Sequence, residues 1–300
     1  MLNYLNFQLI IMNSTKPLQE RIDNYLTTYI SQFAPSNLQQ AMSYSLLAGG
    51  KRIRPILVYL TGQMFNCPLD KLDPIAAAIE SMHTYSLIHD DLPAMDNDNL
   101  RRGKPTCHIQ FGQAEAILAG DALQSLAFSL LCENQHIDNQ SKINMISELA
   151  NASGLAGMCL GQSLDLQAEH QKVTLEHLQN IHNYKTGALI QAAVRLGAYA
   201  SGDVAKPYYQ MLDDYAQAIG LAFQIQDDIL DVIGEQELMG KPQGSDIALE
   251  KSTYPALVGL QNAIEMTNTL YRQAIDSLRQ IPYNSQPLQD LAGFIINRNS

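Results

Sequence analysis

Apolar residues recur at helical spacing along nearly the whole chain, and no stretch of useful length alternates as a β-strand would. Glycine and proline interrupt these runs where helices would end or begin. The pattern predicts an all-α protein of about ten helices joined by short polar connections. The expected helical segments are residues 17–33, 37–48, 55–65, 73–91, 111–133, 141–168, 175–183, 186–200, 207–234, 254–280 and 288–297.

Composition limits the class of protein. Hydrophobic residues make up 46% of the 300 positions, enough for a large core, and no long linker rich in Pro, Gly or Ser divides the chain. We therefore expect one domain over residues 1–300, with residues 1–16 as a disordered extension and Met12 as an alternative start. The net charge of −11 disfavours a nucleic-acid partner.

Cysteine spacing and hydropathy bear on the compartment. Cys67, Cys107, Cys132 and Cys159 show no CxxC or metal-type spacing, so we expect free thiols in a reducing cytoplasm. Judged from the sequence, no apolar run is long enough to cross a membrane. Residues 1–11 are apolar but lack the basic region and small-residue cleavage site of a signal peptide.

A cluster of acids follows the apolar run 75–88. Four carboxylates fall within nine residues: Asp90, Asp91, Asp96 and Asp98. The adjacent arginines Arg101 and Arg102 come next. Each guanidinium could receive a separate anion, or the pair could form salt bridges with the local aspartates.

A second acidic cluster lies far downstream in another apolar run. Asp227, Asp228 and Asp231 are three or four residues apart, so they share one helix face. Ionised carboxylates about 4 Å apart repel by roughly 4 kcal/mol at an effective dielectric near 20. No Lys or Arg lies within 221–239, which leaves solvent, a raised pKa, a distant base or a bound cation. Oxygen ligands favour Mg²⁺, whose shell is usually completed by water and substrate phosphates. A solvated helix face is disfavoured because apolar residues surround the acids.

Basic residues cluster in the GGKRIRP run at 49–55. Its glycines would let a ligand approach the backbone, although their spacing is not that of a Walker A loop. Lys51 offers a point charge and Arg54 a bidentate fork for phosphate oxygens, but a solvated turn would carry the same residues. His83 lies seven residues before Asp90 and shares its helix face.

Further polar residues could reach the same region. Lys185 and Thr186 open an expected helix, a plausible anion site. Gln224 precedes Asp227 by three residues and faces the same way. Lys241 lies in a polar loop, where it could swing over a bound diphosphate or simply be exposed.

Five other polar side chains are assigned with less functional weight. Gln162 and Asp165 stand three residues apart on a largely apolar helix and are expected to face the same cavity. His89, His108 and His182 are expected to be structural.

Together these motifs make the chain resemble the trans-prenyltransferase family of short-chain isoprenyl diphosphate synthases, in particular its bacterial members. The likeness covers nearly the whole chain from residue 49 onward. Its motifs are GGKRIRP at 49–55, DDLPAMD at 90–96, RRG at 101–103, KTG at 185–187, DDILD at 227–231 and KSTYP at 251–255. One departure is visible at 97–99, which reads Asn-Asp-Asn where related enzymes often carry more aspartates. The aspartates expected to bind the metal are still present, so we expect little loss of function.

The resemblance implies an isoprenoid-synthase fold, a helical bundle around a deep central cavity, usually as a homodimer. It also implies three Mg²⁺ ions, two bound through the first acidic motif and one through the second. The metal ligands would be Asp90, Asp96 and Asp227, supported by Asp91, Asp228 and Asp231. The allylic diphosphate would contact Arg101, Lys185, Thr186, Gln224 and Lys241. Isopentenyl diphosphate would contact Gly50, Lys51, Arg54, His83 and Arg102.

The implied reaction joins isopentenyl diphosphate head to tail to dimethylallyl or geranyl diphosphate and stops at farnesyl diphosphate, a C15 product. The allylic substrate ionises, the second substrate's double bond attacks the cation, and a proton leaves. Lys185, Thr186 and Gln224 would be the catalytic residues. Tyr85 and Ser86, five and four residues before Asp90, would set the product length at the cavity floor. Tyr85 could instead be an ordinary core residue.

Three alternatives remain. A synthase stopping at C10 or C20 would differ little in sequence. A terpene cyclase would normally replace the second DDxxD by an Asn/Ser/Glu-type motif and would not need the isopentenyl diphosphate residues. An inactive scaffold subunit would be expected to lose acids from one motif, whereas both motifs are complete here.

Overall fold

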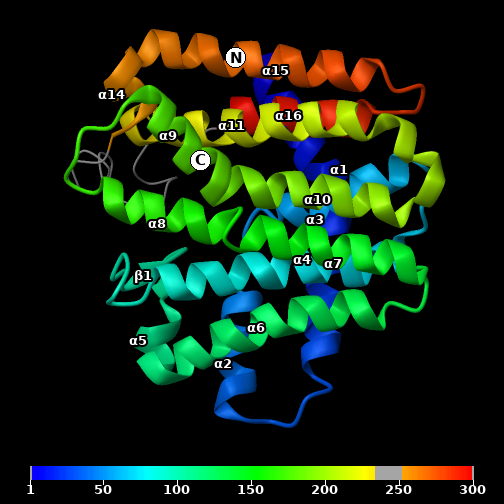
Figure 1. Ribbon diagram of the computed structural model, residues 1–300, viewed down its shortest axis with the longest axis vertical. Coiled ribbons are helices and arrows are strands. Elements are labelled where there is room, and N and C mark those ends of the chain that lie inside the picture. Colours follow the sequence, from blue (N-terminus) through cyan, green and yellow to red (C-terminus); the bar gives the residue numbers. More distant parts are fainter. Residues whose placement is uncertain (1, 234–251, 299–300) are drawn as a thin grey trace.

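The computed structural model describes residues 2–233 and 252–298, and almost all of their regular structure is helical (Figure 1). The helices are α1 (Leu2–Ile30), α2 (Asn37–Leu46), α3 (Ile53–Met64), α4 (Leu69–Asp90), α5 (Cys107–Phe111), α6 (Gln113–Glu133), α7 (Asn139–Ser153), α8 (Met158–Ala168), α9 (Leu175–His182), α10 (Ala188–Ala200), α11 (Tyr209–Ile233), α14 (Tyr254–Val258), α15 (Leu260–Arg279) and α16 (Gln286–Asn297). A π-helical turn, Asn183–Gly187, joins α9 to α10. The all-α prediction is confirmed.

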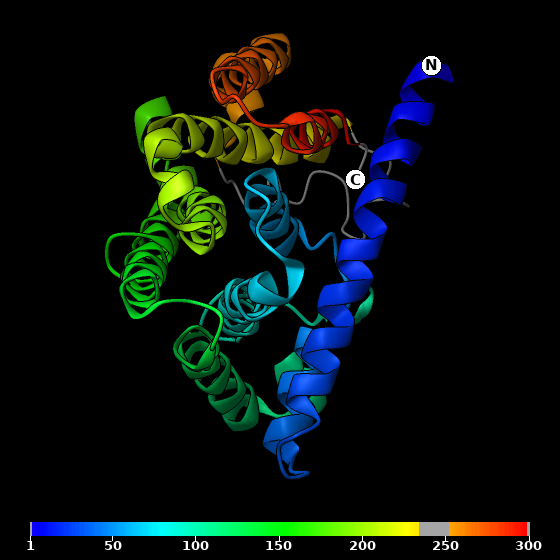
Figure 2. The ribbon, with the colours of Figure 1, turned by 90° about the vertical axis from the view of Figure 1, so that its right-hand side faces the viewer.

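Helices α3 and α4 run through the middle of the molecule (Figure 2). Helix α4 packs against α3, α6 and α10, while α11 packs against α10 and α15. Helix α15 forms an outer layer over α11 in both views, and the long α1 runs along one side (Figures 1 and 2). The two helices that carry the acidic motifs, α4 and α11, are therefore held by neighbours around much of their circumference.

Helix α4 is buried because small and branched apolar residues cover most of its surface. Ala76, Ala77 and Ala78 have no exposed area, and neither do Ile79 and Met82. A helix that is apolar nearly all round belongs in a core. This buried helix ends at Asp90, the first aspartate of the first acidic motif.

The structure corrects several expected boundaries. Helix α1 begins at Leu2, so the expected start at Pro17 is wrong and the residues before it are helical rather than an irregular extension. The expected helix 141–168 is two helices, broken between Ser153 and Met158. At Gly157 a side-chain carbon would lie 2.1 Å from the carbonyl oxygen of Ala152, so only glycine fits this close approach.

Two further breaks were not expected from the pattern. The long segment 254–280 is divided at Gly259, which has a positive φ of 84° and separates α14 from α15. After α4 the chain forms a short antiparallel hairpin, β1 (Leu100–Arg101) with β2 (Lys104–Pro105). Two-residue strands are too short to leave an alternating pattern in the sequence.

Helix α6 is long and apolar enough, by length and composition, to cross a membrane, so the statement that no run reaches that length is wrong. In the structure its Ala116, Ala119, Leu123 and Leu131 have no exposed area, and the helix packs against α4. Part of the apolar surface of α6 is thus buried in the protein core.

Candidate active site

The first acidic motif folds back on itself at the end of α4. The backbone N–H of Asp96 donates to the carbonyl of Asp90 at 2.9 Å, and the N–H groups of Met95 and Asn97 donate to the carbonyl of Leu92 at 2.9 and 3.1 Å. This turn brings Asp96 back beside Asp90. Burial raises the pKa of Asp90 to about 6, and the Asp96 carboxylate adds to the effect against the opposing charge of Lys185. Two crowded carboxylates of this kind suit a hard divalent cation.

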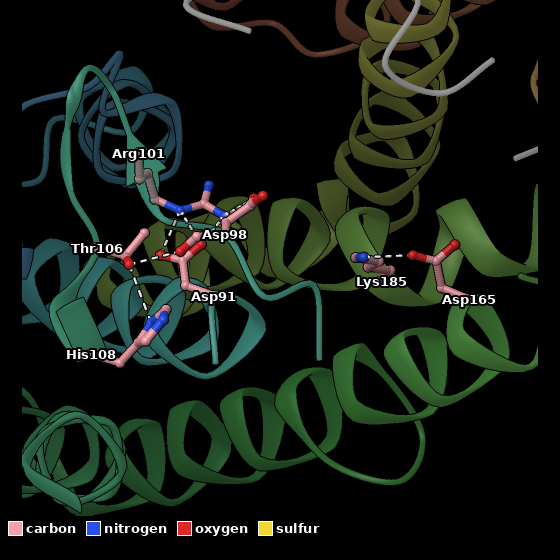
Figure 3. Close-up of polar contacts among 7 residues, drawn as sticks. All are labelled: Asp91, Asp98, Arg101, Thr106, His108, Asp165 and Lys185. Atoms are coloured by element: carbon pink, nitrogen blue, oxygen red, sulfur yellow. Dashed lines mark hydrogen bonds and ion pairs between the residues drawn. The ribbon is translucent and has the colours of Figure 1, made fainter. Parts of the chain in front are cut away.

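Asp91 lies on the other side of the loop. Its carboxylate, 3% exposed, accepts hydrogen bonds from Arg101 Nε at 2.8 and 2.9 Å and from Nη2 at 2.6 Å (Figure 3). Asp98 lies 4.0 Å from the same guanidinium. The structure therefore contains the local salt bridge that the sequence left open for Arg101. Asp91 and Arg101 thus form an ion pair within the loop.

The base of this loop is fixed by a small polar network (Figure 3). The Thr106 hydroxyl donates to the carbonyl of Asp98 at 2.7 Å and lies 3.2 Å from His108 Nδ1. Both side chains are buried, with exposed fractions of 2% and 6%. His108 is thus packed into the base of the loop, and its expected structural role stays a prediction. His89 Nε2 lies 3.1 Å from the carbonyl of Ile117, but His89 also lines one of the cavities described below.

The second acidic motif lies on α11. The Asp227 side chain is 46% exposed, whereas Asp228 and Asp231 are buried at 7% and 8%. Gln224 Nε2 donates to Asp227 Oδ2 at 3.3 Å. Asp228 Oδ2 accepts the backbone N–H of Tyr254 at 2.8 Å, so the start of α14 is bound to this motif.

Arg298, near the end of the chain, also reaches this motif and was missed by the sequence analysis. Its Nη2 donates to Asp227 Oδ1 at 2.6 Å and to the carbonyl of Phe223 at 2.9 Å. The guanidinium lies 3.9 Å from the centre of the Phe223 ring. A single arginine after an apolar helix carries no motif, so nothing in the sequence marked it.

A basic cluster occupies the loop between α2 and α3 and its surroundings. Arg52 turns into the protein, where it pairs with Glu80 at 2.6 Å and Asp23 at 2.8 Å and so anchors the loop. Burial lowers the pKa of Lys51 to about 8, with Arg298 adding to the effect.

The pKa values of other basic side chains in this cluster are lowered as well. Burial lowers the pKa of Arg54 and of Arg102. Burial and the charges of Arg54, Arg102 and Arg101 lower the pKa of His83 well below its usual value. This excess of positive charge is what an anion-binding site requires.

The structure shows why residue 50 is a glycine. Its φ is +123°, and a side-chain carbon there would lie 2.7 Å from the guanidinium carbon of Arg102. Arg102 itself donates to the carbonyl of Gly49. Glycine thus lets the arginine of the RRG motif lie directly on the α2–α3 loop.

Two cavities, of about 360 and 300 Å³, meet at Lys185. The first is lined by side chains from α3, α4, α8 and the π-helical turn: Arg54, His83, Tyr85, Ser86, Asp90, Cys159, Gln162 and Thr186, among others. The second is lined mainly by α8, α9 and α11, through Asp165, His182, Gln224, Asp227 and Asp228. Five of the predicted substrate residues are therefore brought together from segments far apart in the chain: Arg54, His83, Lys185, Thr186 and Gln224. Gly50, Lys51, Arg101 and Arg102 line neither cavity.

Lys185 pairs with Asp165 at 2.7 Å (Figure 3). Burial lowers its pKa, but the charges of Asp165, Asp90 and Asp96 outweigh burial and raise the pKa overall. Gln162 lines the first cavity with both amide atoms buried and without a hydrogen-bond partner, and Arg54 Nε is in the same state. Such orphaned polar atoms indicate a ligand.

Tyr85 and Ser86 line the first cavity, as the resemblance implied. Tyr85 is 6% exposed, and its hydroxyl lies 3.4 Å from the thiol sulfur of Cys159 on α8. The Ser86 hydroxyl donates to the carbonyl of His83 at 2.8 Å. Tyr85 is therefore both well packed and part of the cavity wall.

The predicted metal ligands do not form a ready-made cage. Within residues 2–233 and 252–298, no three carboxylate, imidazole or thiol groups are placed to hold a metal ion by themselves. Mg²⁺ usually binds one or two carboxylates and takes its remaining ligands from water and phosphate. The residues present thus fit Mg²⁺ in company with a diphosphate. Lys241 lies outside the described residues.

The family model for polyprenyl synthetases matches residues 35–283. The chain is 55% identical to the farnesyl diphosphate synthase of Escherichia coli over 272 residues, which cover 89% of this chain and 91% of that protein. It is 52% identical to the farnesyl diphosphate synthase of Haemophilus influenzae, with 94% and 97% covered.

Solved structures agree. The geranyltransferase of Legionella pneumophila has a TM-score of 0.86 at 39% identity, with 97% of this chain and 98% of that chain covered. The geranyltransferase of Helicobacter pylori, solved with magnesium and isoprenyl diphosphate, has a TM-score of 0.81 at 32% identity, with 96% of each chain covered. These likenesses confirm the isoprenoid-synthase fold. The chain belongs to the polyprenyl synthetase family and is a prenyltransferase.

Proposed function

We propose that the chain joins isopentenyl diphosphate head to tail to dimethylallyl or geranyl diphosphate and releases farnesyl diphosphate. The observation that carries the proposal is a charge arrangement. Lys51 and Arg54 lie close enough to Asp227 for their charges to interact, and Lys185 interacts in the same way with Asp90 and Asp96. Basic groups thus lie near both acidic motifs, as two diphosphates and their cations would require.

The basic cluster suits isopentenyl diphosphate. Lys51, Arg54 and Arg102 would bind its phosphate oxygens, and His83, kept neutral by burial and by its cationic neighbours, would donate a hydrogen bond. Gly50 keeps the backbone open beside Arg102. This binding would require no metal, because the basic side chains themselves neutralise the diphosphate.

The allylic diphosphate would lie between the two acidic motifs. Asp90 and Asp96 would hold two Mg²⁺ ions and Asp227 a third, with Asp91, Asp228 and Asp231 in support. Bound Mg²⁺ would neutralise charge on the leaving diphosphate. Arg101, Lys185, Thr186, Gln224 and Lys241 would contact that diphosphate. Since Arg101 and Lys185 are paired with Asp91 and Asp165, those contacts would require the pairs to open or share.

The residues that line the site suit ionisation followed by formation of a carbon–carbon bond. The allylic C–O bond breaks and its electron pair leaves with diphosphate. The double bond of isopentenyl diphosphate forms the new C–C bond, and a proton from the adjacent carbon passes to the departed diphosphate. Thr186 and Gln224 would place oxygen dipoles near the cation. Met95, Met158 and Leu166 give the first cavity apolar walls that keep water from quenching it.

The product would be C15 because Tyr85 closes the cavity wall beside Cys159. A C10 or C20 synthase remains the second candidate. The complete acidic motifs and the basic cluster disfavour a terpene cyclase and an inactive subunit.

We also propose a cytoplasmic homodimer. All four cysteines are free thiols. On α6, Ile117 and Leu118 are 44% and 52% exposed, an apolar surface that a second copy of the chain would cover.

Purified protein incubated with isopentenyl and geranyl diphosphates and Mg²⁺ tests the proposal. Dephosphorylation and chromatography should show farnesol as the main alcohol. A main product of C10 or C20 would support the second candidate, and a cyclic hydrocarbon made without isopentenyl diphosphate would indicate a cyclase.

A further inference from the structure

His182 occupies a junction between three parts of the site. It is the last residue of α9, and the π-helical turn Asn183–Gly187 follows at once. That turn carries Lys185 and Thr186. Turns of π-helix inside helices are rare and often lie at functional sites. The position of His182 therefore sets how the chain enters the turn that carries these two residues.

The imidazole contacts the second acidic motif. His182 Nδ1 lies 3.1 Å from Gln224 Oε1, and Gln224 Nε2 donates to Asp227 Oδ2 at 3.3 Å. Because the Gln224 nitrogen faces a carboxylate, its oxygen must be the acceptor on the other side. His182 Nδ1 therefore carries a proton and donates it. The imidazole thus selects one of the two orientations of the Gln224 amide.

The other nitrogen of the ring faces the same acidic motif. His182 Nε2 is buried, makes no hydrogen bond, and lies 3.7 Å from Asp228 Oδ2. The ring stacks on Tyr254 with centroids 5.7 Å apart and planes at 22°. Asp228 in turn accepts the backbone N–H of Tyr254. His182 is thus enclosed by α11 and α14 while its edge lines the second cavity.

We propose that His182 is a positioning residue that fixes the Gln224 amide toward Asp227 and couples the π-helical turn to the second acidic motif. It deepens the proposed function and rests on it for the identity of the substrate. A freely turning Gln224 would present its oxygen to Asp227 part of the time, a repulsive contact. The imidazole prevents this without touching the substrate. This role goes beyond the structural one expected from the sequence.

Two isosteric variants and a matched control separate positioning from simple packing. His182→Asn places an amide nitrogen near the position of Nδ1, so it keeps the donor to Gln224. His182→Phe keeps the ring against Tyr254 but has no donor. His177→Phe changes a histidine on the same helix that does not line either cavity. The melting temperature of each variant is measured first.

We expect His182→Phe to lower kcat/KM for geranyl diphosphate by about tenfold, as for the loss of one well-placed hydrogen bond. The KM for isopentenyl diphosphate should stay within about twofold, because the basic cluster is untouched. His182→Asn should recover most of the loss. His177→Phe should match the wild type.

Calorimetric titration of Mg²⁺ in the presence of inorganic pyrophosphate gives a readout independent of turnover. Its affinity should fall in His182→Phe and recover in His182→Asn. If the wild type makes no prenyl product, the proposed function fails, while this titration still tests His182. An unchanged titration and unchanged kinetics in His182→Phe would overturn the inference. So would equal losses for both substrates, with a lowered melting temperature and no recovery in His182→Asn.

Discussion

Tyr85 and Asp90 lie five residues apart on α4, about 7.5 Å along the helix axis, and we expect different roles for them. Asp90 lies at the end of the helix beside the returning Asp96. Tyr85 lies deeper, where its hydroxyl meets Cys159. The spacing gave the depth of Tyr85 below Asp90, and the resemblance to the prenyltransferase family implied that Tyr85 would lie at the cavity floor. The sequence could not show that Cys159 on α8 would stand opposite.

Asp90→Asn removes one charge and keeps the shape of the side chain. We expect turnover to fall on the order of a hundredfold or more, because the amide is a poor Mg²⁺ ligand and diphosphate departure loses its charge partner. The melting temperature should not fall. Steady-state kinetics at millimolar Mg²⁺ measure the effect, with Asp98→Asn from the same loop as the control. Full activity in Asp90→Asn would contradict the metal assignment.

Tyr85→Ala should lengthen the product to C20 or beyond, because removing the ring opens the wall of the cavity. Tyr85→Phe is the matched control: it keeps the ring, loses only the hydroxyl with its contacts to Cys159 and Gln124, and should still stop at C15. Chromatography of the dephosphorylated alcohols separates the two. If Tyr85→Ala still stops at C15, Tyr85 is an ordinary core residue and another group sets the length.

Lys51 should give the enzyme a pH dependence. Its pKa is lowered to about 8, so the ammonium charge is present below that pH and is lost as the pH rises through it. We expect kcat/KM for isopentenyl diphosphate to fall several-fold between about pH 7 and 9. Lys51→Arg stays charged and should flatten this fall. Equal profiles in the two proteins would rule out Lys51 as its source.

Among the elements, the sequence predicted the helices whose apolar pattern is long and regular, such as α4, α6 and α11. It failed where one residue decides the path of the chain. Gly157 and Gly259 break two expected helices because the backbone there needs a close approach or a positive φ. Helical spacing also gives no warning of the π-helical turn at Asn183–Gly187, which changes the direction of the residues that follow.

Gly50→Ala tests how the α2–α3 loop meets the β1–β2 hairpin. A methyl group there would displace the Arg102 guanidinium, so the KM for isopentenyl diphosphate should rise about tenfold, as for one lost ionic hydrogen bond. The KM for geranyl diphosphate should not change. Gly202→Ala has a similarly positive φ of 70° but open space around it, and serves as the control. Equal effects in both variants would show backbone strain alone.

Across the whole molecule, the site joins segments that the sequence keeps far apart. Motif spacing identified Lys51 and Asp227 separately, but only the fold places them close enough for their charges to interact. Arg298 joins the same group from the end of the chain, and Tyr254 enters it through a backbone N–H that no side-chain motif reveals. Short-range patterns therefore predicted the residues of the motifs, while long-range packing supplied their partners.

The most direct test of this arrangement is a crystal structure of the chain with Mg²⁺ and inorganic pyrophosphate. We expect one pyrophosphate between α4 and α11, with Mg²⁺ ions joining it to Asp90 and Asp96 on one side and to Asp227 on the other. A pyrophosphate bound by only one acidic motif, with the other left out of contact, would contradict the account.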